Sequence, residues 1–210
     1  MKYNPEIHHR RSIRFQGYDY AQAGACFITI CTQNRECLFG RVVDGQMQLN
    51  EAGRIVAGEW MNTADIRDEV ALDEWVVMPN HFHGILVIAD GRGTADGRGT
   101  ARRAPMAERF GRPVSGSVPT IVRSFKSAVT RRINELRQTP GTGLWQRNYW
   151  EHIIRDDAEW DRIRAYIRDN PARWERDRLY VSPGWPADRP PCPNAVREPS
   201  ADCETEAWMV

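Results

Sequence analysis

The sequence VVMPNHFHGILVI, residues 76–88, places two histidines at the start of an apolar strand. Side chains alternate between the two faces of a strand, so His81 and His83 point the same way, about 7 Å apart, while Phe82 points to the other face. The Pro-Asn step before them indicates a turn or bulge between two strands. Two imidazoles side by side form half of a metal site, although most such pairs on strands hold no metal.

The rest of the chain predicts an α+β domain. Strand-like runs alternate with segments of helical periodicity. We expect strands at 24–33, 41–49, 74–78, 81–88 and 144–155, and helices at 51–66, 117–138 and 157–170. This order favours an α+β sandwich in which helices pack on one face of an antiparallel sheet, and ferredoxin-like topology is the simplest template.

Two residues predict helix boundaries. Asn50 is a good N-cap for the first helix, because its side chain can accept a hydrogen bond from the first turn. Pro171 should stop the last helix, since the residue before a proline disfavours the right-handed helical conformation.

The length of 210 residues suits one domain with extensions. The expected division is a basic N-terminal extension (1–23), the folded domain (24–180) and a proline-rich tail predicted to be disordered (181–210). The hexapeptide ADGRGT occurs at 89–94 and again at 95–100, and such a repeat cannot bury a core. We expect a flexible loop at 90–116, with an arm that touches nucleic acid as the alternative.

Cysteine usage and hydropathy narrow the class of protein. Five cysteines without a CxxC pair disfavour a zinc site or a disulfide framework and fit a reduced cytoplasm. No apolar run approaches the roughly 20 residues that a membrane span needs, and no signal peptide is seen. We expect a cytoplasmic protein with no membrane partner.

The formal net charge of +1 hides a basic region. Residues 101–138 carry nine lysines and arginines against two acids, whereas the tail from 181 is acidic. Such a surface suits phosphate binding, although a solvated surface is the commoner explanation for any one stretch.

The second half of the predicted site lies on the last helix. Tyr166 and Asn170 are one turn apart, beside an apolar stripe that includes Ile163 and Ile167. If this helix covers the sheet face that carries His81, a phenol, an amide oxygen and two imidazoles converge. Taken singly, a tyrosine on such a helix is usually a half-buried packing residue, and an asparagine before a proline is usually a helix terminator.

These residue types suit phosphodiester chemistry. Tyrosine can attack a phosphodiester and keep the bond energy as a phosphotyrosine. Its usual pKa of about 10 makes it a poor nucleophile at neutral pH, and a divalent ion that polarises the phosphate would compensate. Mg²⁺ prefers oxygen ligands and Mn²⁺ accepts imidazole more readily, so both metals are open.

The motifs MPNHFHGILVI and AYIRDNP resemble the histidine–hydrophobe–histidine (HUH) motif and the tyrosine helix of single-strand DNA transposases. Together with the segments 11–20, 32–35, 125–127 and 145–156, they resemble the REP-associated tyrosine transposases over about residues 10–175. The resemblance implies a ferredoxin-like (RRM-like) fold. It also implies a bacterial protein associated with the nucleoid, acting as a monomer or homodimer.

The resemblance implies a role for each site residue. Tyr166 would form a 5′-phosphotyrosine and free a 3′-OH. His81 and His83 would be metal ligands, with Asn170 as the third ligand where mobile relatives usually carry glutamine. The substrate implied is single-stranded DNA beside a palindromic hairpin.

Cationic residues are the candidates for DNA contacts, since phosphates bind arginine and lysine. They are Arg10, Arg11, Arg14, Arg123, Lys126, Arg131 and Arg132. One alternative is a hairpin-binding protein that keeps the fold but does not cleave. Another HUH nuclease, such as a relaxase or replication initiator, is disfavoured by the single motif tyrosine and the lack of a P-loop.

Overall fold

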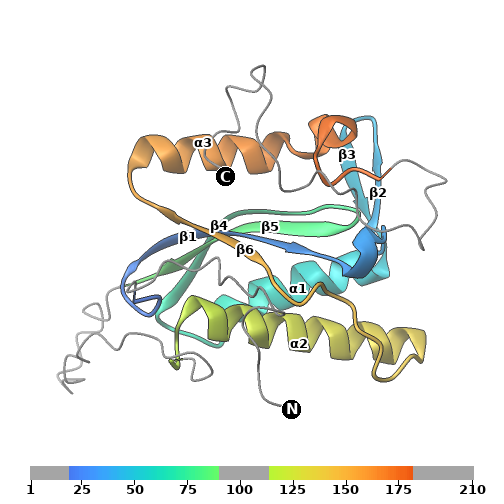
Figure 1. Ribbon diagram of the computed structural model, residues 1–210, viewed down its shortest axis with the longest axis horizontal. Helices are drawn as coiled ribbons and strands as arrows, with labels where there is room; N and C mark the ends of the chain where they lie inside the picture. Colours follow the sequence, from blue (N-terminus) through green and yellow to red (C-terminus); the bar gives the residue numbers. More distant parts are fainter. Residues whose placement is uncertain (1–18, 90–113, 182–210) are drawn as a thin grey trace, which may run out of the picture.

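The computed structural model describes residues 19–89 and 114–181 (Figure 1). Three predictions lie outside the described residues: the basic extension with Arg10, Arg11 and Arg14, most of the 90–116 loop, and the tail from 182. The described elements are β1 (Gly24–Cys31), η1 (Gln33–Arg35), β2 (Gly40–Val43), β3 (Gln46–Leu49), α1 (Glu51–Asp65), β4 (Val70–Val77), β5 (His81–Ile88), α2 (Val118–Arg137), β6 (Trp150–Ile154), α3 (Asp157–Asp169) and η2 (Pro171–Arg176), where η marks a 3₁₀ helix.

Four strands form one antiparallel sheet in the order β4-β5-β1-β6. The pairing of β1 with β5 runs from Gly24 opposite Ile88 to Cys31 opposite His81. Apart from the β2–β3 hairpin and the final α3, the elements run strand, helix, strand, strand, helix, strand, and the first strand lies between the third and fourth. This is ferredoxin-like connectivity, so the predicted α+β class and topology are confirmed.

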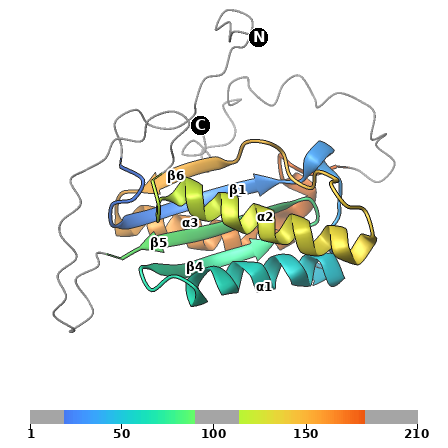
Figure 2. The ribbon, with the colours of Figure 1, turned by 90° about the horizontal axis from the view of Figure 1, so that it is seen from below.

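The helices divide between the two faces of the sheet, which corrects the expectation that they pack on one face. α1 and α2 cover one face and α3 covers the other (Figures 1 and 2). Ile28 and Phe82 belong to the core under α1 and α2, whereas Phe27 and Ile85 pack with Ile163 of α3. Because β1 and β5 are apolar on both faces, both faces need cover, and α3 provides the second.

Several predicted strands have different bounds in the structure, and β4 begins at Val70, four residues before the predicted run at 74–78. The run at 41–49 is a hairpin of β2 and β3 with a two-residue turn at Asp44 and Gly45. Both turn residues have positive φ, 50° and 71°, as an Asp-Gly hairpin turn requires. The run at 144–155 contributes only its last part, β6, to the sheet.

The helix boundaries follow the predicted signals with one difference. Oδ1 of Asn50 accepts a 2.9 Å hydrogen bond from Gly53 N, which confirms the N-cap of α1. α3 ends at Asp169, but Asn170 keeps right-handed helical angles (φ −56°, ψ −44°) and the chain continues into η2. Pro171 therefore begins a 3₁₀ helix instead of forcing an extended residue before it. None of the helices within 19–89 and 114–181 has the length and apolarity to cross a bilayer.

Candidate metal and nucleophile site

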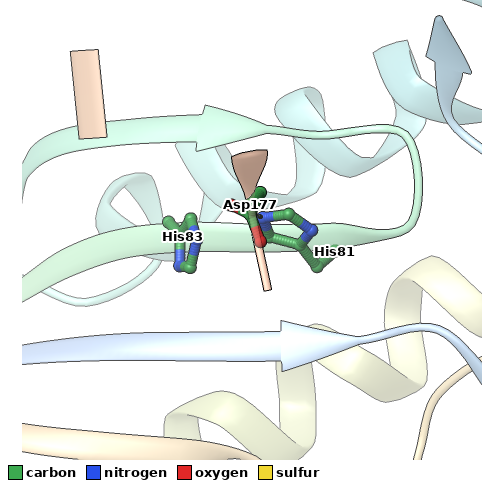
Figure 3. A group of neighbouring side chains, drawn as sticks. All are labelled: His81, His83 and Asp177. Carbon is green, nitrogen blue, oxygen red and sulfur yellow. Dashed lines mark ion pairs between the residues drawn. The ribbon is translucent and has the colours of Figure 1, made fainter. Parts of the chain in front are cut away.

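His81 and His83 begin β5 (Figure 3). Both rings lie on the face of the sheet that α3 and η2 cover, since His81 contacts Trp174 and His83 contacts Tyr166. Their ring centroids are 4.5 Å apart, and both side chains are fully buried. Phe82 packs against Trp60 in the core of the other face. The predicted alternation of the H-F-H motif is therefore confirmed.

The proton on His81 is fixed by its neighbour. Nδ1 of His81 lies 2.8 Å from Oδ1 of Asn80, and an amide oxygen can only accept, so Nδ1 carries the proton. Burial lowers the pKa of His81 to about 3, so the ring is neutral at neutral pH. Nε2 is buried and has no hydrogen-bond partner within the part of the chain that the structure describes. A lone pair in this state is what a metal ligand provides.

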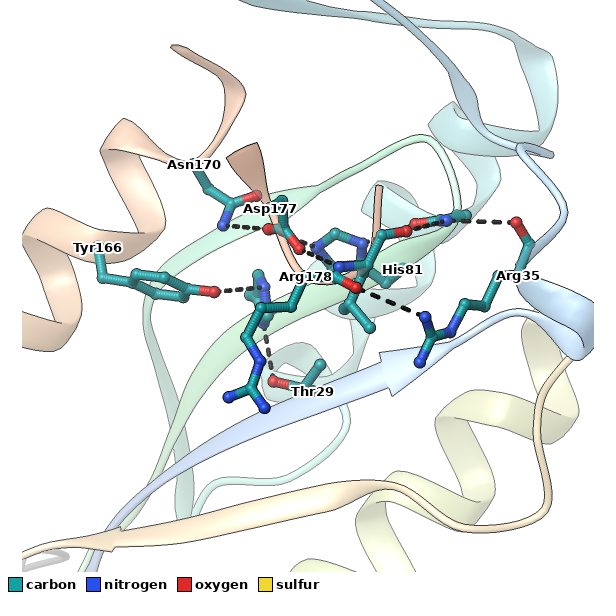
Figure 4. Close-up of polar contacts among 10 residues, drawn as sticks. Thr29, Arg35, His81, Tyr166, Asn170, Asp177 and Arg178 are labelled. Carbon is teal, nitrogen blue, oxygen red and sulfur yellow. Dashed lines mark hydrogen bonds and ion pairs between the residues drawn. The ribbon is translucent and has the colours of Figure 1, made fainter. Parts of the chain in front are cut away.

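The ring of His83 is held from both sides. Its Nδ1 lies 2.8 Å from Oγ1 of Thr29, and its Nε2 lies 3.5 Å from the phenol oxygen of Tyr166 (Figure 4). Burial, together with the neighbouring His81, lowers the pKa of His83 well below its usual value. Because Nδ1 contacts the Thr29 hydroxyl, the opposite ring nitrogen, Nε2, is the one that faces the phenol oxygen of Tyr166.

Asp177, just after η2, completes a group of three possible metal ligands. One ligand atom each from His81, His83 and Asp177 lies within 4.8 Å of the others. Oδ2 of Asp177 is 4.0 Å from Nε2 of His81 and accepts a 3.1 Å hydrogen bond from Nδ2 of Asn170. Its Oδ1 accepts a 2.6 Å bond from the backbone N–H of Leu179, which holds the carboxylate in place.

This donor set fits a divalent cation. It combines two imidazole nitrogens with a carboxylate oxygen, and Oδ1 of Asn170 is a further buried oxygen without a hydrogen-bond partner in the described residues. Buried polar atoms left without a partner cost free energy, so Nε2 of His81 and Oδ1 of Asn170 both favour a bound ligand. His81, His83 and Asp177 could hold a metal ion, with Asn170 beside them.

Tyr166 extends from α3 toward the histidines (Figure 4). Its half-buried ring meets Phe27 edge-on, with centroids 6.1 Å apart, and meets the ring of His83 at 5.3 Å. The structure thus brings Tyr166 next to His83, and Asn170 next to Asp177 of the same group, as expected if the last helix covers the face that carries the histidines. Their chemical roles stay predictions.

Lys126 of α2 is one of the four predicted DNA-contact residues inside the described ranges. Its Nζ donates to the carbonyl oxygens of Gln146 and Arg147 at 2.7 and 3.2 Å, and burial lowers its pKa to about 8. Beside it lies a groove of about 470 Å³, which Arg131 and Arg147 also line. No acidic side chain of the described residues lines this groove.

The other predicted cations of α2 have different surroundings. Arg132 forms a 2.6 Å ion pair with Glu59 of α1, so its charge is already partly balanced. Arg123 and Arg131 are exposed. Of these predicted contact residues, Lys126 and Arg131 line the groove, whereas Arg132 pairs with α1.

Sequence reasoning missed three residues of this site. Asp177 follows Asn170 by seven positions, and the turn of η2 returns it to the histidines. Thr29 lies opposite His83 in the β1–β5 ladder, a register that the sequence does not reveal. Asn80 is expected from the sequence only as part of a turn, although its position directly before a histidine is a possible signal.

Comparisons with known proteins agree with the fold. No protein-family model matches the chain. An uncharacterized protein of Haemophilus influenzae is 44% identical over 184 residues, which cover 86% of this chain and 98% of that protein. The structure of a REP-associated tyrosine transposase bound to a REP hairpin superposes with a TM-score of 0.50 at 19% identity, over 78% of this chain and 73% of the other. The chain therefore belongs to the same family as the Haemophilus influenzae protein and has the fold of a REP-associated tyrosine transposase.

Proposed function

We propose that this protein is a metal-dependent, single-strand-specific DNA endonuclease and strand transferase with Tyr166 as its nucleophile. One observation carries the proposal: the phenol oxygen of Tyr166 lies 3.5 Å from Nε2 of His83. His83 belongs, with His81 and Asp177, to the group of possible metal ligands. A nucleophile next to a buried set of metal ligands is the arrangement that metal-assisted phosphoryl transfer needs.

The residues have distinct roles in this reaction. The Tyr166 oxygen attacks a phosphodiester, the new P–O bond makes a 5′-phosphotyrosine, and the bond to the 3′-oxygen breaks. The phenol gives up its proton and the leaving 3′-oxygen takes one up, so the step is balanced. A bound divalent cation would polarise the phosphate and stabilise the charge that develops on it. Attack by another 3′-OH on the phosphotyrosine would reverse the step and join strands.

Ligand chemistry distinguishes the metals. Two imidazoles and one carboxylate suit Mn²⁺ better than Mg²⁺, which prefers oxygen ligands. Asn170 joins the ligand set through Oδ1 in this proposal, because that atom is buried and its amide nitrogen already bonds Asp177.

The proposed substrate is single-stranded DNA with a palindromic hairpin. The support is the shared fold with a transposase whose structure contains a REP hairpin, together with the cationic groove beside Lys126. Arg123, Arg131 and Arg132, and the N-terminal Arg10, Arg11 and Arg14, remain candidates for phosphate contacts. The proposed catalytic unit is residues 24–180, working on nucleoid DNA in a bacterial cytoplasm as a monomer or homodimer.

A denaturing-gel assay with labelled hairpin DNA tests the proposal. We expect a covalent protein–DNA adduct with Mn²⁺ or Mg²⁺, none with EDTA, and none with Tyr166→Phe. An adduct that persists in Tyr166→Phe would show that the nucleophile is another residue. Hairpin binding that survives EDTA, without cleavage of any hairpin, would favour the non-catalytic binding protein instead.

A further inference from the structure

We propose that Asp73 and His152 are positioning residues, which tie α3 to the two edge strands of the sheet and so set Tyr166 over His83. This inference rests on the proposed function, because it assigns the ties to the reaction of Tyr166. In the order β4-β5-β1-β6, Asp73 lies on one edge strand and His152 on the other.

The tie at β4 starts from an irregularity in the strand. The pairing of β4 with β5 shifts between Leu72 and Trp75, so Asp73 lies in a bulge. Bulges re-aim side chains, and here the Asp73 carboxylate meets α3. Its Oδ2 accepts hydrogen bonds from Nε1 of Trp160 and from Nε of Arg164, the second at 2.8 Å.

The Arg164 guanidinium makes this tie more directional. Nη2 of Arg164 also lies 2.8 Å from Oδ2 of Asp73. The guanidinium carbon Cζ lies 5.2 Å from the centroid of the Trp160 ring. Arg164 precedes Tyr166 by two residues, so the contact fixes the helix close to the nucleophile.

The tie at β6 holds the start of α3. Nε2 of His152 lies 2.7 Å from Oε1 of Glu159, and the other carboxylate oxygen accepts a 2.8 Å bond from Arg155 N. The ring of His152 stacks on Trp150 with an interplanar angle of 5°, which limits its rotation. Glu159 is thus held from the strand and from the turn that leads into the helix.

Between these ties, α3 crosses the central strands β1 and β5. Ile163 and Ile167 pack on Phe27 and Ile85 there, and apolar contact of this kind is not directional. Hydrogen bonds from both edges select one placement of the helix, and the Asn170–Asp177 bond holds its far end. A misplacement of about 1 Å can slow a reaction on the order of 100-fold, so placement of the phenol matters.

The ties are expected to matter more for rate than for stability. The side chain of Arg164 is 39% exposed and that of Asp73 21%, and solvent-exposed ion pairs stabilise little, so this holds best for the tie at β4. The His152–Glu159 pair is less exposed, at 19% and 10%, and contributes more to stability. The buried isoleucines keep the helix on the sheet when a tie is removed. A rate effect without an equal stability effect is therefore the signature of a positioning role.

The experiment compares Asp73→Ala, His152→Ala and the double variant with the wild-type chain and with Arg162→Gln, an exposed arginine of the same helix. We expect each single variant to slow formation of the Tyr166 adduct by about tenfold to 100-fold. Hairpin affinity and Mn²⁺ affinity should change little in each variant, the urea midpoint of Asp73→Ala should change little, and Arg162→Gln should behave as wild type. Asp73→Asn keeps an acceptor oxygen and should restore part of the rate.

Hydrogen exchange separates failure of the ties from failure of the proposed function. Amides of α3 should exchange faster in the double variant than in Arg162→Gln, whether or not any adduct forms. Unchanged exchange in α3, or an adduct rate equal to wild type in the double variant, would overturn the inference. If the double variant does not fold, the Asp73 single variants decide. Should wild type, Asp73→Asn and Asp73→Ala all show the same adduct rate and the same exchange in α3, the Asp73 carboxylate does not position the helix.

Discussion

The phenol oxygen of Tyr166 lies 3.5 Å from Nε2 of His83, although 83 positions separate the two residues in the sequence. Strand β5 supplies the imidazole and α3 supplies the phenol from the layer above it (Figure 1). Thr29 contacts the opposite nitrogen of the same ring, so one hydroxyl on β1 determines which nitrogen faces the nucleophile. Substitutions around this ring test the site directly.

Thr29→Val should weaken metal binding without removing a ligand. The valine has nearly the same shape but leaves Nδ1 of His83 without its 2.8 Å partner. Loss of such a contact to a metal-binding histidine typically lowers metal affinity about 10–100-fold. Calorimetric titration with Mn²⁺ measures the effect, and Thr29→Ser, which keeps the hydroxyl, should bind nearly as wild type. Equal affinity of the valine variant and wild type would contradict the assignment of His83 as a ligand.

Asp177→Asn should lower Mn²⁺ affinity at least tenfold, because it replaces the negative ligand oxygen in the group with His81 and His83. Asn170→Ala should cost less, since the amide is neutral and its nitrogen serves Asp177. The same titration compares the two variants. The opposite ranking would mean that Asn170 is the principal oxygen ligand and that Asp177 serves to orient it.

Glu159 should make stability depend on pH in the acidic range. Burial raises its pKa, but hydrogen bonds from Arg155 N and His152 more than offset this, and the net pKa lies below the ordinary 4.5. Below pH 4.5 the unfolded chain therefore binds the proton more readily than the folded one. The stabilisation is present above pH 4.5 and is lost as the pH falls through the lower, folded-state pKa.

Urea midpoints at pH 7 and pH 3.5 check this dependence. Glu159→Gln should be less stable than wild type at pH 7, and the gap should narrow at the lower pH. Glu135→Gln, at an exposed glutamate of α2, is the matched control and should show no such narrowing beyond the wild-type profile. If the difference in urea midpoint between wild type and Glu159→Gln is the same at both pH values, the charge of the Glu159 carboxylate contributes nothing to stability.

Gly84→Ala should destabilise the domain through overpacking. A Cβ at Gly84 would lie 2.8 Å from Cζ of Phe82 and 2.9 Å from Cζ2 of Trp60, and both rings are fully buried. Extra methyl groups in a packed core typically cost about 1–3 kcal/mol. Thermal unfolding measures the loss. Gly58→Ala, at a glycine of α1 with open space around its Cβ position, should be neutral or stabilising.

Several features could be predicted from local patterns alone. The alternation of His81, Phe82 and His83 follows from the pleat of any strand, and the one-turn spacing of Tyr166 and Asn170 follows from any α-helix. Asn50 caps its helix through a contact three residues away. Such features need no knowledge of distant chain segments, which is why they survive in the structure.

The placement of the last helix depended on the tertiary structure. Helical periodicity shows that Ile163 and Ile167 face a core, but it does not state which face of the sheet they cover. The decision comes from β1 and β5, whose second apolar face is closed only when α3 packs on it.

The sequence alone therefore established the strand histidines, the tyrosine helix and the α+β topology, because each follows from short-range spacing or element order. Only the folded chain brought Asp177 to the histidines, set Thr29 opposite His83 and tied Asp73 to Arg164. These are contacts between elements far apart in the sequence, and strand register, a bulge and a 3₁₀ turn fix them. No local pattern encodes such distances, since they result from how the layers pack.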